Sequence, residues 1–123
     1  MLGCFQHVRD ERVEFVVGDA GNIAVDSAQF DVAVAGLVLN FVAAPDEAVK
    51  GMIQAVKQGG MVAAYVWDYS GQMEMMRHFW DAAIHVDPAA SEVDAGQRFA
   101  ICKPDNLRSL FQSLNLKAVD VIP

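Results

Sequence analysis

The sequence predicts an α/β fold whose mostly parallel sheet has about four strands with flanking helices. Three near-continuous apolar runs carry this prediction: Val13–Val17, Phe30–Gly36 and Met61–Trp67. They are rich in β-branched residues, and turn-like or helical patterns separate them. Strands that are buried on both faces have this pattern, which is typical of parallel sheets. We expect a single domain over residues 1–123, because this length suits one hydrophobic core.

The first long helix is expected over residues 45–57. Pro45 suits the first helical position, where its missing N–H costs nothing. Asp46 and Glu47 complement the positive end of the helix dipole, and Gly59 follows as a C-terminal glycine. The expected buried stripe consists of Ala48, Val49, Met52, Ile53 and Val56.

Two more helices and a last strand follow. One helix is expected over about 72–86, with Ser70 as its N-cap. Its apolar stripe would be Met73, Met76, Trp80, Ala83 and Ile84. Pro104 begins the other helix, and Lys117–Ile122 is the expected fourth strand. Its inward residues would be Leu107, Leu110, Phe111 and Leu114. At the start of the chain, Met1–Glu11 has the spacing of a short helix.

Composition excludes several classes of protein. Hydrophobic residues make up 54% of the chain, which excludes a disordered segment. The formal net charge of −7 disfavours a nucleic-acid partner, since phosphate binding needs clustered Lys and Arg. No apolar run approaches the ~20 residues that span a membrane, and no secretory signal is recognisable. Cys4 and Cys102 are too far apart to indicate a disulfide scaffold, so we expect a cytoplasmic protein.

Polar residues follow three of the predicted strands at their carboxyl ends. These residues are Asp19, Asn40 and Asp68. In parallel α/β sheets, ligands bind beyond the carboxyl ends of the strands. The sequence therefore predicts a ligand site along one edge of the sheet.

Taken in order, the segments VEFVVGDA, FDVAVAGLVLNFV and MVAAYVWDY resemble the class I S-adenosylmethionine-dependent methyltransferases. The closest likeness is to the small-molecule group often labelled type 11, and it runs over about residues 13–122. In that family a glycine-rich cofactor loop and a strand with an acidic end precede the first segment, and both are missing here. We therefore expect the C-terminal part of such a domain, truncated and impaired or inactive as an isolated chain.

The resemblance implies an adenine site at Asp19 and Ala20. The carboxylate would accept a hydrogen bond from the exocyclic amine, and the next backbone N–H would donate to a ring nitrogen. Asp19 could instead simply cap the following turn.

The resemblance also implies that Gly36, Leu37 and Asn40 pass beside the cofactor, since a glycine lets the backbone approach a ligand closely. The alternative is an ordinary strand end, with Asn40 in a turn. Asp68 and Tyr69 could face the methyl acceptor. Tyr69 is equally explained as a packing aromatic.

No nucleophile-and-base set appears, and methyl transfer needs none, since aligning the acceptor with the sulfonium often suffices. His78, Asp81 and His85 have metal-ligand spacing, but with Glu74 and Arg77 they are better explained as the solvated face of a helix, so no metal site is expected. The remaining large side chains nearby, predicted as core, lid or pocket wall, are Met73, Met75, Met76, Phe79 and Trp80.

Two functions therefore compete. The first is a methyltransferase acting on a small molecule, with weak or absent S-adenosylmethionine binding by this chain alone. The second is a non-catalytic, oligomeric interaction module derived from a methyltransferase. A nucleotide-binding fold of another class lacks a G-x-G-x-x-G motif. Open strand edges are templates for pairing, so a homodimer, or a missing N-terminal half, is the expected partner.

Overall fold

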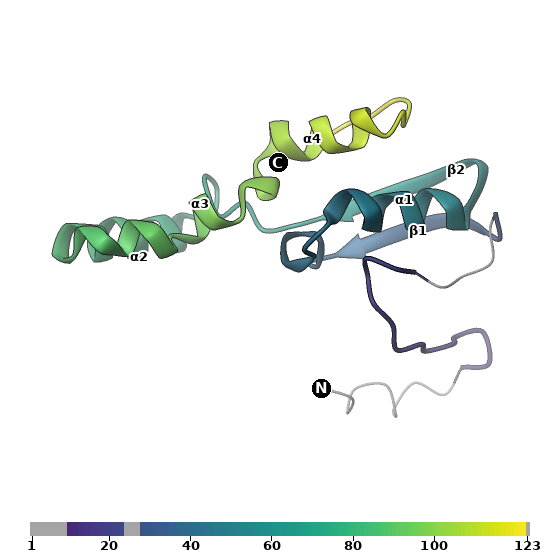
Figure 1. Ribbon diagram of the computed structural model, residues 1–123, viewed down its shortest axis with the longest axis horizontal. Coiled ribbons are helices and arrows are strands. Elements are labelled where there is room, and N and C mark those ends of the chain that lie inside the picture. The colour runs from purple at the N-terminus through teal and green to yellow at the C-terminus, as the bar shows by residue number, and fades with distance from the viewer. Residues whose placement is uncertain (1–9, 24–27, 123) are drawn as a thin grey trace.

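The computed structural model describes residues 10–23 and 28–122 (Figure 1). Its strands and α-helices are β1 (Phe30–Gly36), α1 (Pro45–Ala55), β2 (Val56–Tyr65), α2 (Glu74–Val86), α3 (Ala95–Arg98) and α4 (Pro104–Ser113). Its 3₁₀ helices are η2 (Leu39–Phe41), η3 (Pro88–Val93) and η4 (Ala100–Cys102). The mixed α/β class is confirmed.

β1 and β2 form a parallel sheet, joined by α1. The register runs from Val32 opposite Met61 to Gly36 opposite Tyr65, with an irregularity before it. There, four residues of β2, Lys57–Gly60, lie opposite Asp31 alone. Lys57 Nζ and Asp31 Oδ1 are 2.8 Å apart, so an exposed ion pair spans this bulge.

The prediction of four strands is wrong for two of them in the described residues. Val13–Val17 and Lys117–Ile122 are not strands, and the sheet has only two strands. Both segments have suitable side chains, but a strand forms only where a neighbouring edge accepts its backbone hydrogen bonds. Neither segment is seated against such an edge.

Two predicted boundaries also need correction. α1 ends at Ala55, and β2 already begins at Val56. The segment before β1 accounts for the earlier end of the helix. Gln29 N–H donates to the Ala55 carbonyl at 3.0 Å, so this carbonyl is bonded outside the helix. Lys57, expected in the helix, therefore lies in β2. Ser70 does not cap α2, which begins at Glu74.

The core lies between the sheet, α1 and α4. Its buried members are Ala35, Leu39, Ala48, Val49, Met52, Leu107 and Phe111. The predicted stripes of α1 and α4 thus face inward, as their periodicity indicates. The opposite face of the sheet is bare. It exposes Phe30, Val32, Val34, Met61 and Tyr65.

α2 projects away from the sheet and packs mainly on η3 (Figure 1). No residue of α2 is fully buried. The predicted stripe is nevertheless its less exposed side, since Met76, Trp80, Ala83 and Ile84 are half-buried. Periodicity therefore gave the correct face but not the depth of burial. No helix in the described part of the chain is long and apolar enough to cross a membrane.

The chain exposes more surface than a compact protein of its mass. Its accessible surface is 9128 Å², whereas a compact monomer of 13.4 kDa would expose about 6,500 Å². The bare sheet face, the projecting α2 and the segment around Val13–Val17 contribute to this excess of about 2,600 Å².

The core makes a testable prediction at Val49, which is 0% exposed. Val49→Ala should lower the free energy of unfolding by about 1.5–3 kcal/mol, because two buried methyl groups are lost and a cavity remains. Val86 is 84% exposed and offers a matched control, for which Val86→Ala should change stability by less than about 0.5 kcal/mol. Equal effects in urea denaturation would contradict this assignment of the core.

Candidate functional site

The carboxyl ends of β1 and β2 lie side by side, and the site is built on the two segments that follow them. Leu37 N–H donates to the Tyr65 carbonyl at 2.9 Å, which extends the ladder just past β1. Leu37 has a φ of +55°, a strained conformation for a branched residue. This reverses the chain into η2, which carries Asn40.

Gly36 allows a close approach, as predicted, but in this structure the neighbour is Tyr65. A Cβ at Gly36 would lie 2.7 Å from the Tyr65 Cζ atom, closer than real contacts allow. The glycine is therefore explained by this aromatic ring.

Asn40 carries a polar atom that lacks a partner. Its side chain is half-buried, and within the described residues the amide Nδ2 is buried without a hydrogen-bond acceptor. A buried unsatisfied donor costs about 1–3 kcal/mol. A ligand oxygen at this edge of the sheet would remove that cost.

Asp68 organises the loop after β2. Its Oδ1 accepts hydrogen bonds from Ser70 and from Gly71 N–H, and its Oδ2 accepts from Gln72 N–H at 3.0 Å. Burial on its own would raise the pKa of Asp68, but these hydrogen bonds, led by that from Gln72, outweigh it and lower the pKa below 3.8. The carboxylate is thus ionised and already engaged, which favours a loop-holding role.

Tyr69 packs as an aromatic side chain. Its ring lies 5.3 Å from that of Phe99, and the Phe99 ring lies 5.3 Å from that of Phe41. Phe41 belongs to η2, so this cluster ties the segment after β1 to the segment after β2. The segments that carry Asn40 and Tyr69 thus lie together at the carboxyl ends of the strands, and Asp68, also predicted at this edge, precedes Tyr69.

Asp19 forms a local turn. Its Oδ1 accepts from Gly21 N–H at 2.9 Å, and its carbonyl accepts from Asn22 N–H at 2.9 Å. Within the described residues, neither Oδ2 of Asp19 nor the N–H of Ala20 has a hydrogen-bond partner. The turn-capping interpretation is therefore correct for Oδ1 of Asp19. Oδ2 of Asp19 remains available as an acceptor, and the N–H of Ala20 remains available as a donor.

The Asp19 turn lies against α1. Gly21, Asn22 and Ile23 line a hollow of about 160 Å³ together with residues of α1. The α1 residues are Glu47, Lys50, Gly51 and Gln54. The structure thus joins the Asp19 turn to α1, whereas the Asn40 and Tyr69 segments join at the ends of the strands.

Sequence reasoning missed the ion pair between Arg77 and Asp94. Both guanidinium Nη atoms donate to the Asp94 carboxylate, Nη1 at 3.1 Å. Asp94 is buried and also accepts from Gly96 N–H at 2.8 Å. Arg77 lowers the pKa of Asp94 below 3.8. Placing Arg77 on the solvated face was wrong. The available signal was the Asp94-Ala95-Gly96 sequence, typical of an N-cap.

The solvated face of α2 is otherwise as predicted. His78, Asp81 and His85 are all exposed. In the described ranges, no three His, Cys, Asp or Glu side chains group closely enough to hold a metal ion.

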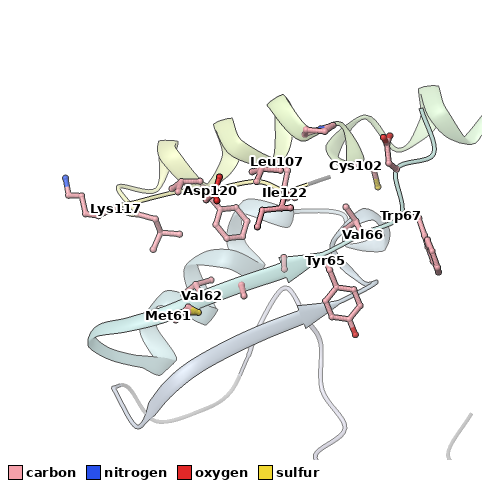
Figure 2. Close-up of a pocket in the computed structure, with 18 of the residues that line it drawn as sticks. Met61, Val62, Tyr65, Val66, Trp67, Cys102, Leu107, Lys117, Asp120 and Ile122 are labelled. Carbon is pink, nitrogen blue, oxygen red and sulfur yellow. The ribbon is translucent and has the colours of Figure 1, made fainter. Parts of the chain in front are cut away.

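A large cavity lies between β2 and α4, a feature that the sequence did not indicate (Figure 2). Its volume is about 1070 Å³. Residues 59–68 form one wall, and α4 with residues 115–122 forms the other. We call this cavity the β2 groove. Cys102 lines it, and burial, with a smaller contribution from Asp68, raises the pKa of that thiol, so it stays protonated at neutral pH.

Comparison with known proteins gives one match. A family model described as a methyltransferase domain matches residues 1–64, which is slightly more than half of the chain. The match extends through β1, α1 and most of β2. No curated protein and no solved structure gives a significant match.

The Arg77–Asp94 pair predicts how stability depends on pH. Because the pKa of folded Asp94 lies below its ordinary 3.8, the pair stabilises the fold fully above that value. Its contribution is lost as the pH falls through the lowered pKa. At neutral pH, Asp94→Asn should cost about 1.5–3 kcal/mol, the value of a hydrogen bond to a charged group.

The matched control is Asp120→Asn, since Asp120 is exposed. Denaturant unfolding at several pH values between about 6 and 3 should show a shallower loss of stability for Asp94→Asn than for the wild type. The control should follow the wild type. Parallel curves for all three proteins would contradict the assignment.

Proposed function

We propose a function from the premise that this chain belongs to the methyltransferase domain family, within the class I S-adenosylmethionine-dependent methyltransferases. The proposed function is that of a methyltransferase-like protein with a small-molecule acceptor. It would bind S-adenosylmethionine weakly or not at all by itself, and would be impaired or inactive as an isolated chain.

The open pair at Asp19 and Ala20 carries this proposal. Asp19 Oδ1 is held by Gly21 N–H, which fixes the carboxylate and leaves Oδ2 as an acceptor. The neighbouring N–H of Ala20 is a donor. An acceptor and a donor on successive residues match the exocyclic amine and a ring nitrogen of adenine. The residues thus fit the adenine end of the cofactor.

Gly36, Leu37 and Asn40 support the proposal at and just after the end of β1. The positive φ of Leu37 turns the chain there, and the Asn40 Nδ2 donor lacks a partner. The cofactor, when bound, supplies a methyl group activated on a sulfonium. The role that remains for the protein is to align the acceptor. Asp68, whose oxygens accept four hydrogen bonds, is better suited to holding its loop than to removing a proton.

Weak binding is proposed because the contacts are incomplete. Residues 1–18 contain two glycines, Gly3 and Gly18, and no glycine-rich loop. Contacts to the methionine and ribose parts of the cofactor therefore have no counterpart in this sequence. We place the protein in the cytoplasm, where the buried free thiol of Cys102 suits a reducing environment.

The second candidate is a non-catalytic, oligomeric module. Its first supporting observation is the surface excess of about 2,600 Å². In addition, Asp68 is hydrogen-bonded within its own loop, and the Tyr69 ring packs on Phe99. A homodimer that covers apolar surface is proposed in either case. The scattered basic residues and the charge of −7 argue against nucleic acid as the partner.

Calorimetry tests the cofactor site without relying on activity. The isolated chain should bind S-adenosylhomocysteine more weakly than low-micromolar. If binding is measurable, Asp19→Asn should weaken it by about 1.5–3 kcal/mol, because an amide accepts less well than a carboxylate. Asp120→Asn is the control and should leave the affinity unchanged. Tight binding would contradict the proposed weakness, and an unaffected Asp19→Asn would remove Asp19 from the site.

A further inference from the structure

The β2 groove runs along an edge of the sheet. Its wall contains every residue from Gly59 to Asp68 in succession. Successive residues of a strand point to opposite faces of the sheet. The lining thus includes Met61 and Tyr65 of the bare face together with Val62 and Ala64 of the covered face, as expected for a groove that follows the edge of the strand. β1 occupies one edge of β2, so the groove follows the other edge.

This edge presents backbone groups that lack partners. The Tyr65 carbonyl points to β1, where it accepts from Leu37 N–H. Alternate residues of a parallel strand face the same neighbour, so Val62 and Ala64 direct their N–H and C=O groups away from β1. Within the described residues, no other backbone group pairs with them.

The other wall is mostly apolar. It includes Leu107 and Phe111 of α4, with Val119 and Ile122 beyond it (Figure 2). The volume of about 1070 Å³ lies just above the ~300–1,000 Å³ typical of small-ligand sites. A purely apolar ligand would bury the backbone groups of β2 unsatisfied, which is costly. An extended polypeptide would satisfy them and place apolar side chains against α4.

The chain itself contains a suitable strand. Val13–Val17 is apolar apart from Glu14, is β-branched at three positions and forms no strand here. Val16 and Val17 are highly exposed, Val17 at 82%. Ile23 packs on Gly51 of α1, and residues 28 and 29 bond to the end of that helix. These contacts hold the preceding segment on the β1 side, away from α4 (Figure 1). In this structure the segment is therefore not seated in the groove of its own chain.

We propose that the β2 groove binds Val13–Val17 of a second copy of this chain, as an added strand on the free edge of β2. The inference rests on the homodimer proposed above and gives it a location. Mutual exchange, in which each copy supplies its strand to the other, forms a closed pair. Obligate dimers bury about 1,000–2,500 Å² per chain, and this chain has exposed apolar surface to contribute, including Val16 and Val17.

The first test changes the inserted strand. Val17→Lys places a charge where the strand would be buried, and it should weaken dimerisation at least tenfold. Val86→Lys is a matched control, because Val86 is the same residue type with nearly the same exposure, 84% against 82%, and lies on α2. Light scattering coupled to size exclusion should give twice 13.4 kDa for the wild type and for Val86→Lys. Val17→Lys should run as a monomer at micromolar concentration.

The second test changes the groove. Ala64→Pro removes the N–H directed into the groove but no ladder donor to β1, and proline is tolerated at such an edge. It too should be monomeric. Mixing the two monomeric variants should restore a heterodimer, because the intact strand of Ala64→Pro meets the intact groove of Val17→Lys. An unfolded variant could not give this restoration.

The outcomes separate the two proposals. A monomeric wild type overturns self-association and, with it, the groove as its location. A wild-type dimer that persists in both Val17→Lys and Ala64→Pro overturns the groove alone and leaves the homodimer standing. Calorimetry with S-adenosylhomocysteine tests the proposed cofactor site independently of both results.

Discussion

The rest of this structure depends on one parallel ladder, which pairs β1 with β2 and seats α1 against one face of both. A helix connection between parallel strands covers only the face over which it crosses. With two strands, a single helix is enough to complete a small core around Val49 and Leu39, the most fully buried side chains. The same geometry leaves the other face and the outer edge of β2 to be covered by something else. The large exposed surface of the chain is a direct result.

Local pattern predicted the elements that this ladder organises. Phe30–Gly36 is the strand that its apolar run indicates, and Pro45 and Pro104 begin α1 and α4 as their fixed backbone angle favours. Two other segments were also predicted as strands from their composition. They are Val13–Val17 and Lys117–Ile122, and neither forms a strand in the structure. Composition measures how well side chains suit a pleated surface, whereas a strand also needs a partner edge in register. Such an edge is a property of the whole assembly, so the pattern within one segment could not supply it.

The candidate site was predictable to a similar extent. That polar residues gather after the strands follows from topology, and Asn40 and Tyr69 do meet there through Phe41 and Phe99. The specific partners were beyond prediction, because a carboxylate such as Asp68 can serve a ligand or its own loop equally well. Arg77 shows the same limit. The sequence placed it on the solvated face of α2, because its partner Asp94 lies 17 residues away, on a segment whose path the sequence did not reveal.

The contact of Tyr65 with Gly36 has a consequence for the alignment of the two strands. Both residues lie on the bare face of the sheet, opposite one another, and the ring occupies the space that a side chain at Gly36 would need. A slip of two residues would keep every apolar side chain on its present face, so burial alone would not oppose it. It would, however, bring the ring of Tyr65 over Val34 or Val38, where branched side chains fill that space. The missing side chain at position 36 thus selects one alignment from among several that hydrophobicity would accept equally.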